Sequence, residues 1–378
     1  MNSDILNLDR HWQLIVVGGG LAGLSCAASC AKQGIGPILL LEAENLPGAH
    51  SSGRNAGLVR NCAEDPWITR LCIEGARFIE QNLGGDERNA RFHRTGSLIF
   101  DQGQAVSADS WQQVPHQDWS RQQFLDTYPE FGSAPTGTPR YVASDGVVEV
   151  PALLAVFAQQ AIAGGVEICC GVTAERPIAS DGCFQGLRIA GIDVSAEAVV
   201  VANGAWAGQW SESVGLPIDL QPFLRSCLTT EALSGSRMLR PWLWNHDHGW
   251  YLRPGVDETL WSGCEEIEDQ PGRAQPQGDP WGGLQNKIED LIPQIHNHSL
   301  RRIWAGHRSF CPDRRFLLGP DPRLSGWHWA VGLGGHGVTA AHAVGERVAH
   351  GISSGSDALE APFLWSEERF SLTSAGTT

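Results

Sequence analysis

The chain has 378 residues, of which 42% are hydrophobic and 18% are charged, and its formal net charge is −15. This length suits two domains or one large domain with a second lobe, and the apolar fraction excludes a disordered or fibrous protein. A surface this acidic repels phosphate backbones, so we expect no nucleic acid partner.

The start of the chain, MNSDILNLDRHWQ, has no basic stretch leading into an apolar run, as a secretory signal peptide would have. The longest apolar runs, Leu14–Val17 and Ile38–Leu41, are too short to cross a bilayer. The ten cysteines are irregularly placed and form no CxxC pair of the kind that binds metal. We therefore predict a cytoplasmic protein with reduced thiols, without a metal site or transmembrane segment.

The first predicted elements are a strand and a helix joined by a glycine turn, in LIVVGGGLAGLSCAASCAKQG (14–34). The apolar run LIVV is typical of a strand buried on both faces, and Gly18, Gly20 and Gly23 then form the pattern G-x-G-x-x-G. These glycines permit a tight turn, the approach of a pyrophosphate to the backbone, and close packing of a helix expected over Leu24–Gln33. The next strand ends at Glu42, where an acid can accept from a ribose 2′-hydroxyl. This order of elements predicts a dinucleotide site.

The loop that follows, AENLPGAHSSGRNAGLVRN (43–61), helps to identify the dinucleotide. Glu42 would repel the 2′-phosphate of NADP, which leaves NAD and FAD. A long polar loop with His50, Arg54 and Asn55 favours a cofactor that extends beyond its pyrophosphate, as a flavin does. The segments VEICCGVTAE (166–175) and AEAVVVANGAWAGQW (196–210) are typical of strands that return to the same sheet, and the second ends in another turn at Asn203.

Near the end of the chain, AVGLGGHGVTAAHAVGE (330–346) predicts a second strand, glycine turn and helix. Gly334, Gly335 and Gly337 form this turn around His336, and the helix is expected over Val338–His350. Free N–H groups at a helix N-terminus favour negative charge, so this turn is also a candidate anion site.

Six stretches resemble the D-amino acid oxidase family of FAD enzymes, which includes glycine and sarcosine oxidases and D-amino acid dehydrogenases. They are VVGGGLAGLS, HSSGRNAG, VVVANGAWAG, WYLRP, IWAGHRSFCPD and AVGLGGHGVTAAHAVGE, and they follow this order across nearly the whole chain. Within the family, the chain is most similar to bacterial D-arginine dehydrogenases. The resemblance implies that the first turn holds the pyrophosphate of FAD. It also implies that the second turn lies beside the N1 and O2 edge of the isoalloxazine, where reduction places negative charge.

The resemblance also implies an α/β fold. We expect a Rossmann-like FAD-binding domain with a parallel sheet, and an α+β substrate lobe with a mixed or antiparallel sheet. The FAD-binding domain is expected in three pieces, 1–83, 145–217 and 311–365, and the substrate lobe in two, 84–144 and 218–310, followed by a disordered tail at 366–378. The Gly- and Pro-rich stretch 269–283 is expected to be an exposed loop and is a candidate cover of the active site.

FAD is expected to bind without a covalent bond. His50 in HSSG resembles the His-Ala-Ala-Gly segment through which dimethylglycine and sarcosine dehydrogenases attach FAD, but D-arginine dehydrogenases carry a similar His-Ser-Thr-Gly segment without that bond. Some sarcosine oxidases link flavin through a cysteine, but the matching position here is Gly306, so Cys311 is expected to be inert. The residues expected to contact FAD are Gly18, Gly20, Leu21, Ala22, Gly23, Glu42, Ala43, His50, Ser51, Ser52, Arg54, Asn55, Ala56, Gly57, Val172, Asn203, Gly204, Trp206, Gly334, Gly335, His336, Gly337, Val338 and Thr339.

Four residues are candidates for substrate contact. Arg308 in WAGHRSF and Arg225 in LQPFLRSCLTTE could pair with a carboxylate, because a guanidinium fork matches its geometry. Tyr251 aligns with a family tyrosine that contacts substrate, and His336 lies in the second turn. Each has a plainer interpretation: a structural ion pair for the arginines, core packing for the tyrosine, and a hydrogen bond to a carbonyl group for the histidine.

The reaction implied is oxidative deamination of an amino acid by hydride transfer from its α-carbon to flavin N5, which gives an imino acid and then a 2-oxo acid and ammonia. We expect a D-amino acid with an apolar, aromatic or small side chain. D-arginine dehydrogenases hold an acid where ARFHRTGSLIF offers Arg91, His93 and Arg94, and the run PWLWNHDHGWYL favours an aromatic pocket.

The electron acceptor is expected to be a quinone or O2. Sarcosine oxidases activate O2 with a lysine near flavin N5, but this chain has only Lys32 and Lys287, and the matching position holds Trp261. A dehydrogenase is therefore favoured. An oxidase of the glycine or sarcosine type, a flavoprotein subunit of an electron-transfer complex and a tRNA-modifying flavin domain stay open, although the acidic surface opposes the last of these.

Overall fold

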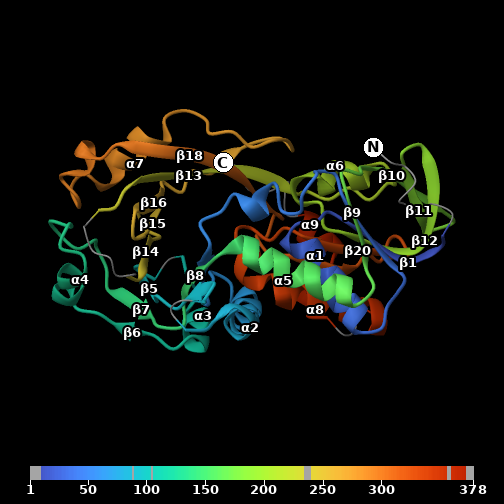
Figure 1. The fold of residues 1–378 in the computed structure, drawn as a ribbon, viewed down its shortest axis with the longest axis horizontal. Coiled ribbons are helices and arrows are strands. Elements are labelled where there is room, and N and C mark those ends of the chain that lie inside the picture. Colours follow the sequence, from blue (N-terminus) through green and yellow to red (C-terminus); the bar gives the residue numbers. More distant parts are fainter. Residues whose placement is uncertain (1–9, 87–88, 104, 234–239, 356–358, 372–378) are drawn as a thin grey trace.

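The computed structural model describes residues 10–86, 89–103, 105–233, 240–355 and 359–371. Its elements form two halves, one around an eight-stranded sheet and the other around a nine-stranded sheet (Figure 1). Among the described residues, no helix combines the length and the apolar character that crossing a bilayer requires.

The first sheet contains the predicted nucleotide-binding strands. Five strands run parallel, in the spatial order β9 (Glu167–Cys170), β2 (Ile38–Glu42), β1 (Trp12–Val17), β12 (Ile192–Val201) and β20 (Trp327–Val331). Antiparallel strands extend this core: β19 (Leu317–Pro320) pairs with β20, and β11 (Cys183–Ile189) joins β12 to β10 (Ala174–Ser180).

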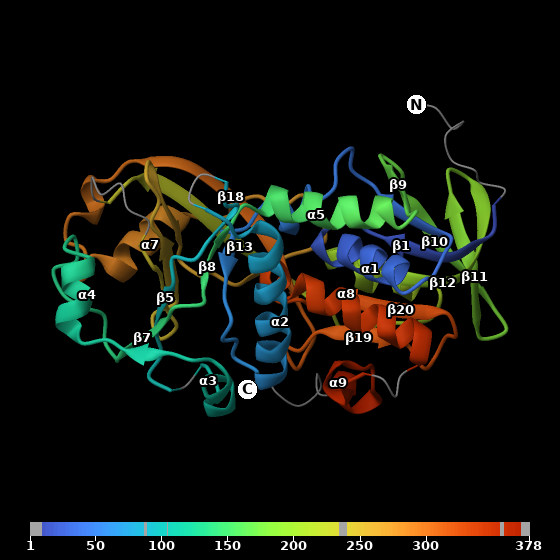
Figure 2. The same cartoon turned by 60° about the horizontal axis from the view of Figure 1, so that its bottom comes forward.

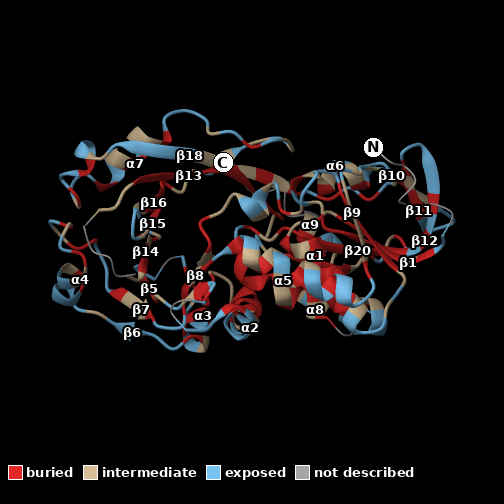
Figure 3. Cartoon of the chain, in the orientation of Figure 1, coloured by how far each residue is buried: buried red, intermediate tan, exposed pale blue. Residues whose placement is uncertain are grey.

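Both faces of this sheet are buried. Leu14 and Val16 of β1 pack into one hydrophobic cluster and Ile15 and Val17 into another, as the two-residue period of a strand requires. The first cluster includes residues of four helices, α1 (Leu21–Lys32), α2 (Pro66–Leu83), α5 (Val150–Ala163) and α8 (Gly337–Ser354). Helices α1 and α8 lie side by side (Figure 2), and Figure 3 shows them largely buried, whereas α5 has an exposed outer side.

Contact between α1 and α8 depends on one small residue. A Cβ atom at Gly345 of α8 would lie 2.3 Å from Oγ of Ser25 on α1. A larger residue at this position would push the two helices apart. The contact is important for the site because α1 and α8 each begin at one of the two glycine turns.

The second sheet is mixed and belongs to the other half of the molecule. Its order is β17 (Ile267–Glu268), β13 (Gln221–Glu231), β16 (Glu258–Ser262), β15 (Trp250–Arg253), β14 (Trp242–Asn245), β5 (Ser97–Phe100), β7 (Pro139–Val142) and β6 (Gln117–Asp118). The ninth strand, β18 (Leu300–Phe310), pairs with β13 along most of its length. Strands β5 and β14 are parallel, and the other pairs are antiparallel. The β13–β18 ribbon runs from this sheet towards the first half (Figure 1).

A small sheet and several short helices complete the fold. The small sheet has the order β3 (Leu58–Val59), β8 (Gly146–Val148) and β4 (Phe92–His93). The short helices are α3 (Ala108–Gln113), α4 (Arg121–Thr127), α6 (Ala207–Glu212), α7 (Pro280–Ile288) and α9 (Glu367–Ser371). This architecture confirms the predicted fold class, a parallel α/β sheet joined to an α+β half with a mixed sheet.

Several element bounds differ from the sequence-based expectations. The helix expected from Leu24 begins at Leu21, and the second helix extends to Ser354. The strand expected over 166–175 is two strands. β9 pairs with β2, the chain turns at Gly171, which has φ +72°, and β10 then pairs with β11 elsewhere in the sheet. The predicted tail begins with α9, and its residues from 372 lie outside the described part of the chain. The predicted division into three FAD-binding and two substrate-lobe pieces stays a prediction.

Candidate functional site

A cavity of about 800 Å³ connects the two glycine turns. This volume lies within the range of roughly 300–1,000 Å³ that is typical of small-molecule sites. Its walls include Gly20–Ala22 of the first turn, loop residues 51–57, parts of β13 and β18, and residues 332–339 around the second turn. Segments from both ends of the chain therefore meet at one concave site.

The first turn has the shape that a phosphate cradle needs. Gly18 adopts φ +108°, which favours glycine, and a Cβ atom at Gly23 would lie 1.8 Å from the carbonyl oxygen of Gly18. A Cβ atom at Gly20 would lie 3.0 Å from Oγ of Ser52. The three glycines thus keep the turn tight and the start of α1 close to the sheet, as the motif predicted.

Glu42 stabilises this turn through its carboxylate. Its Oε2 accepts from the backbone N–H of Gly19 at 2.7 Å, and its Oε1 accepts from the N–H of Glu44 at 2.8 Å. Asn203 lies beside Gly18, and its buried Oδ1 has no hydrogen-bond partner within the described ranges. A buried acceptor without a partner can accept a hydrogen bond from a hydroxyl group of a bound ligand. The residues around the first turn therefore fit the adenosine half of FAD.

The second turn packs against β18. Gly334 and Gly335 both have positive φ, of +49° and +92°, and a Cβ atom at Gly335 would lie 2.9 Å from Cζ of Arg308. Helix α8 begins directly afterwards, and Gly337–Thr339 at its start line the cavity. The first N–H groups of a helix have no partner within it, so this wall suits an anionic group.

The register of the β13–β18 ribbon brings two predicted arginines to one face. Arg225 lies opposite Gly306, and Phe223 lies opposite Arg308. Side chains two residues apart on a strand share a face, so Arg308 is a diagonal neighbour of Arg225. A Cβ atom at Gly306 would lie 3.0 Å from the carbonyl oxygen of Arg54, so the backbone of Arg54, and no side chain of β18, covers the position opposite Arg225.

The guanidinium of Arg308 has no hydrogen bond or ion pair with any other residue that the structure describes. Its Cζ atom lies 5.9 Å from the centre of the Trp244 ring, and the residue lines the cavity. Burial and the neighbouring charge of Arg225 lower the pKa of Arg308 below its ordinary value. A cation held beside another cation without a carboxylate is a ready binding site for an anion.

Arg225 is already paired. Its Nη2 donates to Oε1 of Glu266 at 2.9 Å, and its Nε donates to the carbonyl oxygen of Glu265 at 3.3 Å. The structural ion pair that was one interpretation of Arg225 is therefore present. Its place on the cavity wall also leaves the substrate role open.

Tyr251 lies on the cavity wall with only 1% of its surface exposed. Its hydroxyl contacts Sγ of Cys227 at 3.2 Å. Burial, and then the neighbouring Cys227, raise the pKa of Tyr251 well above its ordinary value, so the phenol stays protonated and can donate.

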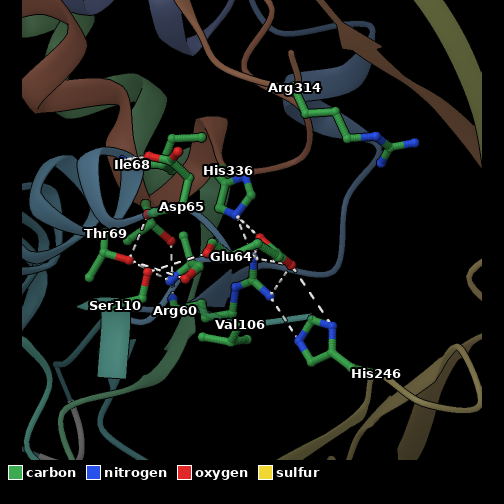
Figure 4. Close-up of polar contacts among 12 residues, drawn as sticks. Arg60, Glu64, Asp65, Ile68, Thr69, Val106, Ser110, His246, Arg314 and His336 are labelled. Atoms are coloured by element: carbon green, nitrogen blue, oxygen red, sulfur yellow. Dashed lines mark hydrogen bonds and ion pairs between the residues drawn. The ribbon is translucent and has the colours of Figure 1, made fainter. Parts of the chain in front are cut away.

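The sequence interpretation missed a polar cluster around the second turn, formed by Arg60, Glu64, His246 and His336 (Figure 4). Arg60 binds both carboxylate oxygens of Glu64, with nitrogen–oxygen distances of 2.8–3.0 Å, and its guanidinium lies 4.4 Å from the centre of the Trp244 ring. Nε2 of His336 contacts Oε2 of Glu64 at 3.1 Å and also Nη2 of Arg60. All four residues line the cavity.

The charges within this cluster oppose one another. Burial would raise the pKa of Glu64, but Arg60 and a hydrogen bond from His336 hold it well below its usual range. Burial and the charge of Arg60 lower the pKa of His336, and the same two causes lower that of His246 to about 4. At neutral pH the cluster therefore holds one cation, one anion and two uncharged imidazoles.

Most of the predicted contact residues meet at the cavity. All four substrate candidates line it. The expected FAD contacts that line it are Gly20, Leu21, Ala22, Ser51, Ser52, Arg54, Asn55, Ala56, Gly57, Gly204, Gly334, Gly335, His336, Gly337, Val338 and Thr339. The expected FAD contacts outside its wall are Gly18, Gly23, Glu42, Ala43, His50, Val172, Asn203 and Trp206. Their roles as contacts stay predictions.

His50 and Cys311 do not line the cavity, although each is next in sequence to a residue that does. Nε2 of His50 contacts Oε1 of Glu44 at 2.9 Å, and its ring packs edge-on against Trp206. Burial raises the pKa of the Cys311 thiol to about 12, which leaves it protonated and unreactive. Neither side chain is therefore on the cavity wall, where a covalent bond to FAD would have to form.

The residues expected to define the substrate side chain lie elsewhere. Arg91 pairs with Glu149 and Arg94 with Glu80, and neither these arginines nor His93 line the cavity. Trp242, Trp250 and Trp261 are buried in the core, so only Trp244 of the tryptophan-rich run faces the site. The aromatic wall is consequently smaller than the sequence indicated, and four acids, Glu64, Asp65, Glu266 and Asp313, border the cavity instead.

Comparisons with known proteins agree with this geometry. A family model described as FAD dependent oxidoreductase, DAO, matches residues 13–350. The chain is 25% identical to 4-methylaminobutanoate oxidase (formaldehyde-forming) of Paenarthrobacter nicotinovorans, over 93% of this chain and 45% of that protein. It is also 25% identical to glycine oxidase of Bacillus subtilis, over 90% of this chain and 93% of that one.

Two further comparisons concern length and fold. The chain spans less than half of several curated relatives, including 40% of mouse sarcosine dehydrogenase, with which it shares 24% identity over 90% of its own length. Among solved structures, glycine oxidase of Geobacillus kaustophilus superposes with a TM-score of 0.78 at 21% identity, covering 94% of this chain and 99% of that one. The fold is therefore the one seen in that enzyme.

Proposed function

The chain belongs to the DAO family of FAD-dependent oxidoreductases, and on this premise we propose that it oxidises the carbon–nitrogen bond of an amino acid through a carboxylate bound to Arg308. The observation that carries the proposal is the guanidinium of Arg308 on the cavity wall, which has no partner among the residues that the structure describes. A substrate carboxylate would supply the missing countercharge and would be held by a planar fork, which fixes its orientation.

Neighbouring residues support the same orientation. The hydroxyl of Tyr251 is protonated and lies on the same wall as Arg308, so it can donate a further hydrogen bond to a carboxylate. The start of α8 faces the cavity beside the second turn, where its free N–H groups stabilise negative charge that develops during reduction. When bound, FAD supplies the two-electron acceptor for hydride from the substrate α-carbon.

The amine is best accommodated without its extra proton. His246 and His336 are uncharged and have lowered pKa values, which makes them weak proton acceptors at neutral pH. Arg60 is neutralised by Glu64, but Arg308 adds positive charge to the same wall, and positive charge disfavours an ammonium group. We therefore assign the two histidines to hydrogen bonding with a neutral amine.

The substrate proposed first is a D-amino acid with an apolar, aromatic or small side chain. Glycine or an N-methylated amino acid is the second candidate, favoured by the names of the curated relatives, which include glycine oxidase and 4-methylaminobutanoate oxidase. Anaerobic bleaching of the bound flavin by a panel of D-, L- and N-methyl amino acids distinguishes the two. An enzyme that no amino acid in the panel bleaches would contradict both.

For the electron acceptor we propose a quinone in preference to O2. Lys32 contacts Glu346, and Nζ of Lys287 donates to the carbonyl oxygens of Gly249 and Gly263, so neither lysine of the chain lines the cavity. Rapid reoxidation of the reduced enzyme by air in a stopped-flow experiment would reverse this assignment and favour the oxidase.

For the cofactor linkage we propose a non-covalent complex. The contact of His50 with Glu44, away from the cavity wall, supports this proposal. Acid precipitation should release the yellow colour into the supernatant, and colour retained in the pellet would contradict it.

A further inference from the structure

Five arginines line the cavity, namely Arg54, Arg60, Arg225, Arg308 and Arg314. Arg60 holds Glu64 with both of its terminal nitrogens, and Glu266 pairs with both Arg225 and Arg314. Arg54 donates to the carbonyl oxygens of Ala49 and Ala274. Among the described residues, the guanidinium of Arg308 has neither a carboxylate nor a hydrogen-bond partner. Three of the five cations are therefore already paired with glutamates of the chain itself.

The Glu266 carboxylate bridges two arginines, one buried and one exposed to solvent. Its Oε1 accepts from Nη2 of the buried Arg225 at 2.9 Å, and its Oε2 accepts from Nη2 of Arg314 at 2.8 Å. The side chain of Arg314 is 58% exposed, whereas that of Arg225 is 8% exposed. Glu266 itself lies in the segment between β16 and β17, with 30% of its side chain exposed, so it faces the cavity from a loop.

Arg225 holds its glutamate with fewer hydrogen bonds than Arg60 does. Arg60 binds Glu64 through both terminal nitrogens, whereas Arg225 binds Glu266 through Nη2 alone. The other contacts of Glu266 come from Nη1 and Nη2 of Arg314, at 3.5 and 2.8 Å. Among the described residues, Nη1 of Arg225 has no hydrogen-bond partner. Arg225 thus has the capacity to bind a carboxylate other than that of Glu266.

Ionised Glu266 also carries a negative charge close to the proposed substrate carboxylate. Burial would raise its pKa, but the hydrogen bond from Arg314 and the charge of Arg225 hold that pKa below its usual range. Because Arg308 is the diagonal neighbour of Arg225 on the β13–β18 ribbon, a ligand on Arg308 lies next to the Arg225–Glu266 pair.

We propose that Glu266 occupies a second carboxylate position on Arg225 and thereby restricts the enzyme to amino acids that carry a single carboxylate. The inference rests on the proposed function, in which Arg308 binds the substrate carboxylate. A second carboxylate on the ligand would have to displace Glu266 or lie against it, and like charges in contact disfavour binding. Without Glu266, the same cavity presents two adjacent cationic positions and suits amino dicarboxylates.

The test compares unreactive ligands in the FAD-loaded enzyme. Dissociation constants of acetate and benzoate are measured against those of malonate and succinate, from the change in the visible flavin spectrum and from the thermal midpoint. Glu266→Ala should strengthen dicarboxylate binding relative to monocarboxylate binding by about 10- to 100-fold, the typical effect of one added charged hydrogen-bonded contact.

Matched variants separate this effect from the change in total charge. Glu268→Ala removes the same charge two residues away, where the side chain is exposed and off the cavity wall, and should leave the ratio unchanged. Adding Arg225→Gln to Glu266→Ala should abolish the gain. If Glu266→Ala does not retain FAD, Glu266→Gln should show a gain in the same direction.

The outcomes also distinguish this inference from the proposed function. An unchanged ratio in both Glu266 variants, with monocarboxylates still bound, would overturn the role of Glu266 alone. Failure of monocarboxylates to bind the unmodified enzyme would instead overturn the carboxylate site on Arg308.

Discussion

Within the described part of the chain Arg308 has no countercharge, so its replacement should affect ligand binding much more than folding. Arg308→Met should lower kcat/KM and monocarboxylate affinity by at least about 100-fold, because a buried charged hydrogen-bonded pair is lost. Arg302→Met is the matched control, since Arg302 lies on the same strand but is exposed and paired with Glu258. Unchanged carboxylate binding in Arg308→Met would remove the basis of the proposed substrate orientation.

Asp145 gives a separate prediction about stability. It accepts from the backbone N and Nδ2 of Asn61, both at 2.8 Å, and from Oγ of Ser97 at 2.7 Å. Burial nevertheless raises its pKa to about 6 from an ordinary value of 3.8. A raised carboxyl pKa means that the folded state binds the proton more tightly, so stability from this group is present below about pH 4 and falls as the pH rises towards 6.

Asp145→Asn should remove this loss. The quantity to compare is the free energy of unfolding of the variant minus that of the parent. By linkage, this difference should be about 2–3 kcal/mol larger at pH 7.5 than at pH 4. Urea unfolding at the two pH values measures the difference. Asp118→Asn, at an exposed position, serves as the control and should leave the pH dependence as it is. An equal slope in the parent and in Asp145→Asn would contradict the burial argument.

Single residues were predictable where their type is tied to one geometry. The glycines of both turns and Arg308 belong to this group, because a tight turn and a carboxylate fork each demand a particular residue. Glu64 was not predictable in the same way. Arg60 and Glu64 lie before α2 begins, outside any helix whose periodicity would place them on one face, and His246 reaches them only through the second sheet.

At the scale of elements, the second turn and β18 act as one unit. A Cβ atom at Gly335 would meet the Arg308 guanidinium, whereas nothing lies within 4 Å of a Cβ atom at Gly355 at the opposite end of α8. Both glycines have positive φ, of +92° and +82°, so an alanine at either costs about 1–2 kcal/mol in backbone strain.

Gly335→Ala should therefore raise KM at least about tenfold by displacing Arg308, whereas Gly355→Ala should keep KM within error at a similar loss of stability. Steady-state kinetics and thermal midpoints on the pair measure both effects. Equal KM values in the two variants would show that the turn does not position Arg308.

Element types were easier to predict from the sequence than element partners. β1, α1 and β2 follow from an apolar run, a glycine turn and a second apolar run, because these are local patterns. The split of 166–175 into β9 and β10 depends on one glycine with positive φ and on which edge of the sheet is free. Trp244 reaches the cavity while Trp242 and Trp250 do not, since that depends on pairing with β5 and β15.

For the whole molecule, the cavity wall joins segments from both halves, so cofactor binding should stabilise the complete fold. Adding FAD to the cofactor-free protein at about 100 times its dissociation constant should raise the thermal midpoint by roughly 3–4 °C. ADP, which can fill only the first-turn end, should bind more weakly and give a smaller rise at the same concentration. A midpoint that does not change with FAD concentration would contradict a shared site.

The same arrangement limits when during synthesis the protein can become active. β20 and α8 are synthesised well after β12 and α1, yet β20 pairs with β12 and α8 covers α1. A nascent chain therefore carries an unpaired strand edge and an apolar helix surface until α8 has left the ribosome. We expect cofactor capture to wait for that moment, and the growing chain to be more prone to aggregation before it.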